Sequence, residues 1–185
     1  MKRSMLGAML MMFCMVGVQN AWAQSDLHLE SGGFEVGLVS PENADGTVGL
    51  TGFLNLGTVA PRVRLSSYLD FWSESQSAFG TKASMRDIAL SFRGTYQFPV
   101  NNPKLQPFAG AGLGLHLVHA KVDVTDPFSG QTMTAEDSST KLGLDIGGGV
   151  TSPLSPRTDL QGELWYGIVS DVSQLSLKVG LAFRM

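Results

Sequence analysis

Apolar and polar residues alternate along most of the chain, and a period of two is the pattern of β-strands. The last segment shows it most clearly, with Leu175, Leu177, Val179, Leu181, Phe183 and Met185 on one face. Five segments alternate in this regular way and three more do so less regularly. The ranges that we expect to form strands are 33–40, 47–57, 62–72, 87–98, 105–122, 141–150, 160–168 and 175–185.

The longest of these expected strands contains a change of phase. Apolar residues alternate with glycines from Ala109 to Leu117, and the apolar positions then move to Ala120, Val122 and Val124. One extra residue in a strand shifts the alternation in this way. The pattern therefore predicts a β-bulge near Val118.

The connections between the expected strands fall into two classes. Proline marks the short ones, at 57–61, 99–103 and 152–156. The other class includes two longer polar stretches, 73–84 and 123–140, and is completed by 41–46 and 170–174. Short turns at one end and longer loops at the other are typical of outer-membrane barrels, whose short turns face the periplasm.

The polar face of these strands indicates which side meets the solvent. It carries mainly Gly, Ser and Thr with isolated charges of both signs, and charged residues make up only 16% of the chain against roughly 25% in soluble domains. The apolar faces of the five regular strands carry no charge. Because Arg or Lys on a lipid face costs about 2–4 kcal/mol at mid-bilayer, we predict that the apolar face meets lipid.

A sheet in lipid has to close, because every backbone N–H and C=O needs an internal partner. Eight strands leave an interior that side chains just fill. We therefore predict an all-β fold, an eight-stranded antiparallel up-and-down transmembrane β-barrel with a salt-bridged, plugged lumen. The charges expected to line that lumen are Glu35, Arg64, Asp70, Arg93, Asp145, Glu163, Lys178 and Arg184. Aromatic residues expected near the headgroups are Trp72, Phe98, Trp165 and Phe183.

The first 23 residues have the pattern of a cleaved signal peptide. Lys2 and Arg3 precede an apolar run from Leu6 to Val18, and Ala21-Trp22-Ala23 gives a small-x-small cleavage site. The run is shorter than the roughly 20 residues of a membrane helix. We therefore expect a signal peptide over 1–23 and a barrel domain over 24–185. The single cysteine excludes a disulfide framework, and a net charge of −3 argues against nucleic-acid binding.

Two stretches resemble the small eight-stranded outer-membrane barrels of the OmpA transmembrane-domain, OmpX and opacity-protein type. Pro107 to Gly114 is similar to a common strand of that family, and Lys178 to Met185 is similar to its C-terminal assembly signal. The positions that carry the signal are Lys178, Gly180, Phe183 and Met185, the last standing where members usually have Phe. The resemblance implies a Gram-negative outer membrane, contact with its lipids and lipopolysaccharide, and insertion by the barrel-assembly machinery.

The resemblance implies no single activity, because the family includes adhesins and structural anchors. We expect a structural or surface-interaction role, with an extracellular ligand reached through 73–84 and 123–140. An OmpW-like channel for apolar solutes is the alternative. A lipid-modifying enzyme is disfavoured, because the His-x-Ser pair of the lipid A deacylases is absent around His116 and His119. We expect no cofactor and no metal, and the spacing of the acidic residues in 123–140 matches no known calcium loop.

Overall fold

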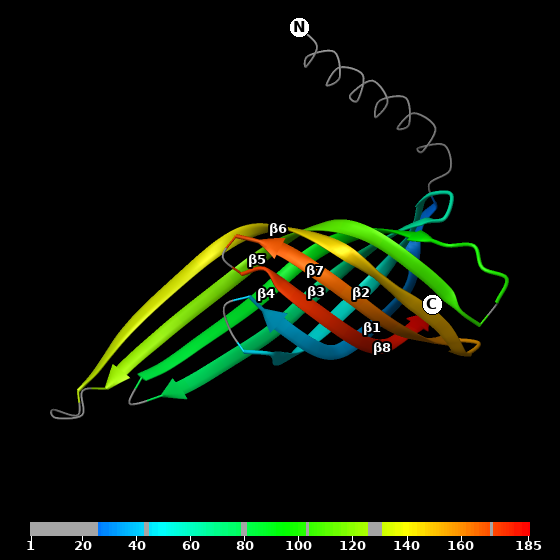
Figure 1. Ribbon diagram of the computed structural model, residues 1–185. Coiled ribbons are helices and arrows are strands. Elements are labelled where there is room, and N and C mark those ends of the chain that lie inside the picture. The colour runs from blue at the N-terminus through cyan, green and yellow to red at the C-terminus, as the bar shows by residue number, and fades with distance from the viewer. Residues whose placement is uncertain (1–25, 43–44, 79–80, 103, 126–130, 171) are drawn as a thin grey trace, which may run out of the picture.

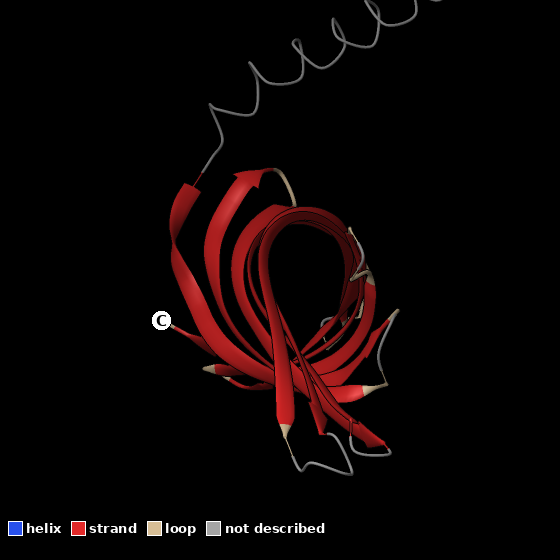
Figure 2. Ribbon diagram, turned by 90° about the vertical axis from the view of Figure 1, so that its left-hand side faces the viewer, coloured by secondary structure: helices blue, strands red, loops and turns tan. Residues whose placement is uncertain are grey.

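The computed structural model describes residues 26–185 apart from 43–44, 79–80, 103, 126–130 and 171. Eight strands follow one another and form a closed antiparallel barrel in chain order (Figures 1 and 2). Their bounds are β1 Asp26–Pro41, β2 Thr47–Ala60, β3 Val63–Ala78, β4 Thr81–Gln97, β5 Gln106–Thr125, β6 Thr132–Ser155, β7 Thr158–Val169 and β8 Gln174–Arg184. No helix in the described residues is long and apolar enough to cross a membrane. The expected signal peptide lies outside the described residues.

The barrel closes between the first and the last strand. The β1–β8 register runs without a shift from Ser31 opposite Arg184 to Pro41 opposite Gln174. Figure 2, which looks along the barrel, shows the resulting ring of strands. The predicted fold class is confirmed, because neither end of the sheet is left without a partner strand.

The outer face of the barrel is apolar and exposed. Leu38 is 65% exposed, Leu177 57% and Leu142 67%, although all three lie within paired strands. Large apolar side chains exposed to this extent need a non-aqueous surrounding. Phe98 and Phe183 also lie on this face, whereas Trp72 and Trp165 are each only 1% exposed.

The prediction that the two tryptophans lie at the headgroups is therefore wrong. Both occupy inward positions of their strands, where the register sets Trp72 opposite Asp87 and Trp165 opposite Gly147. An inward indole fills the lumen and can use its N–H there, as Trp165 does by donating to Glu163 Oε2 at 2.8 Å. Aromatic character alone does not tell the inner face from the outer one.

Strands β3, β4, β5 and β6 continue beyond the others at one end of the barrel (Figure 1). Residues 73–84 and 123–140 are largely strand and not loop, so that part of the prediction is wrong. The β3–β4 register is unbroken up to Ala78 opposite Thr81, and the β5–β6 register up to Thr125 opposite Thr132. Water wets both faces of a strand outside the bilayer, so such a strand needs no apolar face and its composition imitates that of a loop.

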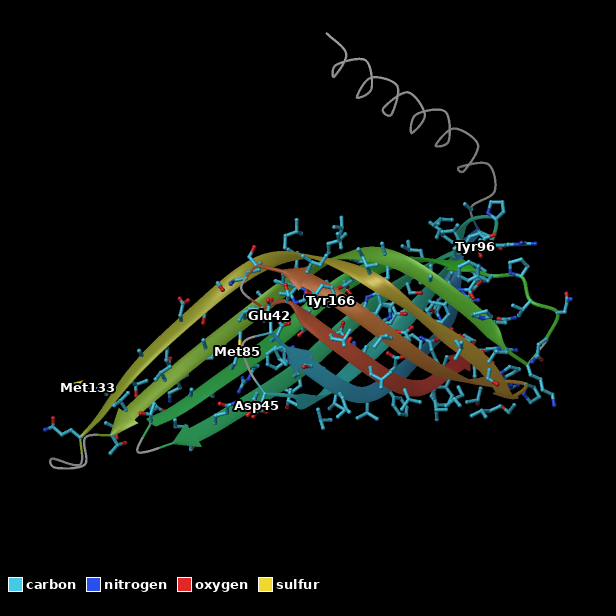
Figure 3. The ribbon with its side chains drawn as sticks, in the orientation of Figure 1. Glu42, Asp45, Met85, Tyr96, Met133 and Tyr166 are labelled. Atoms are coloured by element: carbon cyan, nitrogen blue, oxygen red, sulfur yellow. The ribbon has the colours of Figure 1, made fainter. Side chains whose placement is uncertain are left out.

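We call this part of β3–β6, residues 73–78, 81–86, 119–125 and 132–140, the extracellular extension, after the side of the membrane on which the sequence analysis expects the longer connections. Met133 marks its far end in Figure 3, and Tyr96 lies at the opposite end of the barrel, beside the short turns. Glu42 and Asp45, in the connection between β1 and β2, lie well short of Met133. The extension is therefore a four-stranded sheet that stands on one side of the barrel mouth.

The predicted bulge near Val118 is also wrong, because β5 keeps its register with β4 and β6 along its whole length. The apolar residues change face instead. Leu113, Leu115 and Leu117 point outward and are 51–58% exposed, while Val118 is 6% exposed and faces the lumen. Since the strand leaves the lipid after Leu117, its outer face becomes polar without any change in the pleat.

We expect the folded protein to migrate differently on an SDS gel before and after boiling. The ring of strands closed by β1 and β8 exposes no sheet edge within the membrane-spanning part from which detergent can begin to open it, so unfolding is slow until the sample is heated. Two bands that interconvert on heating are the expected result. A single position at all temperatures would contradict closure of the barrel.

Candidate functional site

The inside of the barrel gathers charged side chains around Arg93, which is 3% exposed on β4. Its Nε donates to Asp145 Oδ2 at 3.0 Å and its Nη2 donates to Asp70 Oδ2 at 3.1 Å. The guanidinium carbon also lies 4.2 Å from the ring centre of Tyr68 and 4.6 Å from that of Trp165. One cation thus joins strands β3, β4, β6 and β7 across the lumen.

A second cation reaches the same carboxylate from β8. Lys178 Nζ forms a short ion pair with Asp70 Oδ1, which also accepts a hydrogen bond from Thr51 Oγ1 at 2.6 Å. Lys178 is 6% exposed and Asp70 is 8% exposed. Asp70 therefore binds both buried cations, and its loss would leave Lys178 without the carboxylate that it contacts.

Glu163 on β7 accepts hydrogen bonds from three side chains and is 1% exposed. The donors are Gln161 Nε2 at 2.6 Å, Trp165 Nε1 at 2.8 Å and the Tyr68 hydroxyl at 3.1 Å. Gln161 Nε2 also lies 3.3 Å from Glu35 Oε1. Hydrogen bonds of this kind lower the cost of burying a carboxylate.

Six of the eight residues expected in the lumen lie in this central group, and two do not join it. Arg64 pairs with Glu30 at 3.1 Å, and Arg184 pairs with Asp159, with its Nε 2.8 Å from Oδ2. Both pairs border a polar cavity of about 380 Å³ at the end of the barrel that carries the short turns. Alternation places a residue on the inner face, but its height in the lumen depends on the strand register.

A buried hydrogen-bonded pair that the sequence analysis missed lies on the other side of Arg93. His116 Nδ1 is 2.8 Å from Asp87 Oδ2, and the two side chains are 3% and 1% exposed. Both residues occupy inward positions of β4 and β5. The alternation placed both residues on the inner face, but it could not show that they are close together. That follows from the register, in which Ala89 is the partner of His116 and Asp87 lies two residues from Ala89 along β4.

An apolar cluster lies next to this pair, toward the extracellular extension. Val39, Trp72, Val118 and Val172 are 1–6% exposed and pack together, with Met85 against them. Val172 belongs to the connection between β7 and β8, outside any strand. From the end with the short turns to the opposite end, the lumen therefore holds a polar cavity, the Arg93 group, the Asp87–His116 pair and an apolar layer.

Glycines on the inner face supply the room for these side chains. A Cβ placed on Gly112 would lie 2.6 Å from Arg93 Cγ, and one on Gly147 would lie 2.7 Å from Trp165 Cδ2. Gly180, part of the expected assembly signal, would likewise meet Glu35 Cγ at 2.6 Å. The glycine runs of β5 and β6 are thus the counterpart of the bulky residues opposite them.

The remaining residues of the expected assembly signal occupy both faces of β8. Lys178 points into the lumen and Phe183 is 43% exposed on the outer face. The amide of Met185 donates to Glu30 O at 3.0 Å, next to the last pairs of β8 with β1. The recognition of these residues during assembly stays a prediction.

The model of the outer membrane protein beta-barrel domain matches residues 6–184. The chain belongs to this family. Its eight strands, its apolar outer face and this membership place it in the bacterial outer membrane. A comparison with curated protein sequences finds no significant match.

Solved structures of outer-membrane barrels share the fold. Neisserial surface protein A is 20% identical, with a TM-score of 0.51 over 84% of this chain and 95% of that one. Ail of Yersinia pestis is 13% identical, with a TM-score of 0.54 over 85% of this chain and 100% of its own. A major outer membrane protein of Thermus thermophilus is 14% identical, with a TM-score of 0.60 over 85% of this chain and 100% of its own. At these identities the likeness concerns the fold alone.

No group of three or more His, Cys, Asp or Glu side chains is placed to hold a metal ion in the described part of the chain. In the extracellular extension, Asp123 accepts a hydrogen bond from Thr134 Oγ1 at 2.6 Å, which holds the pKa of that carboxyl below its usual value. Lys121 lies 3.4 Å from Asp123 and 3.6 Å from Glu136. Asp123 and Glu136 thus contact neighbouring side chains.

We expect Arg93→Ala to destabilise the barrel strongly. It leaves Asp70 and Asp145 buried with one cation fewer, and breaking a buried pair in this way costs about 3–5 kcal/mol. The free energy of unfolding in urea, measured in lipid vesicles, tests this. Arg157→Ala, an exposed cation in the turn between β6 and β7, is the control and should change the free energy by less than about 0.5 kcal/mol. Equal losses in the two variants would show that Arg93 does not hold the lumen together.

Proposed function

We propose that this protein is a closed outer-membrane barrel whose role is structural and interactive, and that its extracellular extension makes contacts outside the cell. The observation that supports the proposal is the set of buried side chains inside the barrel. Arg93 and its partners occupy the middle, and Val39, Trp72, Val118 and Val172 occupy the extracellular side. A solute would have to break buried ion pairs and displace an apolar layer to pass.

The extension supports the interaction half of the proposal. Residues 132–140 of β6 pair with β5 on one side, and pairing of β6 with β7 begins only at Gly143. In the described residues, this stretch therefore has no strand on its second side. A strand edge of this kind can accept an extended segment of another molecule through its backbone groups.

The likeness to Ail is relevant to the kind of contact but does not define it. One Ail structure contains the heparin analogue sucrose octasulfate, with 14% identity and a TM-score of 0.52 to this chain. We propose that this barrel also meets an extracellular ligand through its extension. The role is not enzymatic in this proposal, and delivery by a signal peptide over 1–23 and insertion by the barrel-assembly machinery belong to it as expectations.

We expect no steady single-channel current from the protein in a planar bilayer, because the lumen contents leave no continuous path. The heat-dependent gel shift verifies that the protein preparation used for the bilayer is folded. Steady currents that the wild type shows and that persist in both Arg93→Ala and Lys178→Ala would contradict the plugged lumen and favour a small channel.

We expect Ser77→Cys to react with a membrane-impermeant maleimide on intact cells. Ser77 is exposed near the far end of β3, in the extracellular extension. Asn101→Cys, exposed between β4 and β5 at the opposite end, is the matched control and should react only after the outer membrane is opened. The only native cysteine, Cys14, falls within the expected signal peptide. Labelling of Asn101→Cys alone on intact cells would invert the proposed orientation.

A further inference from the structure

The extracellular extension has one apolar face and one polar face. The apolar face continues the inward positions of the barrel, such as Trp72 and Val118, and we call it the inner face of the extension. Its apolar side chains are Ala83 and Met85 of β4, Ala120, Val122 and Val124 of β5, and Met133 of β6. Every outward position in 73–77, 82–86, 119–125 and 132–140 is polar or charged.

Most of this inner face is bare. Val122 is 39% exposed, Val124 47% and Met133 76%. A strand with water on both sides needs no apolar face, and the apolar face of a sheet is normally buried against another element. At the barrel end the same face is covered, because Met85 packs against the apolar cluster of the lumen. The inner face, which runs from Met85 to Met133 in Figure 3, is therefore an uncovered continuation of that cluster.

Two carboxylates stand on the edges of the inner face. The register places Glu74, Met85, Ala120 and Asp137 in one row across the four strands. At about 4.8 Å between strands, the two acidic residues are roughly 14 Å apart, one on each edge. Among the residues that the structure describes, neither carboxylate has a cation within ion-pair distance. The inner face thus offers an apolar centre between two unpaired negative charges.

The dimensions of this face match one α-helix. A shallow pocket of about 190 Å³ lies on it, and its lining includes Glu74, Ala83, Met85 and Val122. A helix with its side chains is about 10–12 Å wide, so it fits between two edges that are roughly 14 Å apart. From Met85 to Thr81 the face extends roughly 13 Å along the strands, the length of about nine helical residues. A helix that lies along β4 and β5 would therefore cover the apolar side chains and leave both carboxylates beside it.

We propose that the inner face of the extension binds an amphipathic basic helix of a partner polypeptide. The apolar stripe of the helix lies on β4 and β5, and lysine or arginine side chains on its flanks reach Glu74 and Asp137. The inference rests on the proposed function, because it names the partner of the extension. An anionic amphiphile would be repelled by the two carboxylates, and an extended segment would pair with the edge of β6 and leave the face bare. A basic helix uses both the apolar centre and the charges.

The test is the fluorescence anisotropy of a labelled peptide titrated with the folded protein in phosphatidylcholine nanodiscs. The probe is a peptide of about fifteen residues with leucine on one helical face and lysine on the other, because much shorter helices are marginal in water. We expect the peptide to bind the protein above the level of empty nanodiscs. A peptide of the same composition in scrambled order, which has no apolar stripe, should not bind above that level.

Two double variants separate the apolar contribution from the charges. Val122→Ser with Val124→Ser should weaken binding about ten-fold, because two apolar side chains no longer contact the helix. Glu74→Gln with Asp137→Asn should weaken it about five-fold, as expected for two exposed ion pairs. The matched control is Asp123→Asn with Glu136→Gln, which removes two carboxylates from the opposite face of the same strands and should bind like the wild type. The gel shift verifies that all three variants fold.

Three results would overturn the proposal. They are the absence of binding by the wild type, equal binding of the scrambled peptide, and equal weakening by the two variants that remove carboxylates, which would indicate attraction to the overall negative charge. Failure of the proposed function gives a different result. Labelling of Asn101→Cys alone on intact cells would contradict the orientation of the extension and leave binding in nanodiscs unchanged.

Discussion

The pairing of every peptide group inside a hydrocarbon layer is the constraint on which this structure depends. It requires a ring of strands, and here β1 closes the ring by pairing with β8. A closed ring gives each strand one face toward lipid and one toward a narrow interior. The apolar exposed residues, the buried charges and the glycines all follow from that division of faces.

The interior solves a second problem, because charges inside a narrow ring have little water to solvate them. Arg93 meets two carboxylates and two aromatic faces, and Lys178 shares one of those carboxylates. Gly112 and Gly147 leave the space that Arg93 and Trp165 fill. Large polar side chains and glycines on facing strands are thus one arrangement and not two unrelated features of the composition.

The sequence allows the number of strands and the face of each that meets lipid to be predicted, because alternation makes a period of two visible. Closure then follows from the need of every backbone group in lipid for a partner. It does not show the height of a residue in the lumen. Arg64 and Arg184 therefore pair with Glu30 and Asp159 at the mouth, and the Asp87–His116 pair was missed.

The extension could not be predicted for a different reason. Outside the bilayer a strand has no lipid-facing side, so residues 73–84 and 123–140 lack the pattern by which strands are found. The same boundary produced the false bulge, since polarity inverts at Val118 while the register continues. The alternation of apolar and polar residues depends on whether each face of a strand meets lipid or water, as well as on the geometry of the strand.

The whole structure depends on apolar residues that face acyl chains and tryptophans that face the lumen. Quenching of tryptophan fluorescence by lipids with brominated acyl chains tests it directly in vesicles. We expect these lipids to quench the added residue of Leu177→Trp strongly and the native Trp72 and Trp165 far less. Strong quenching of the wild type, with no additional quenched emission from Leu177→Trp, would contradict the assignment of the two faces.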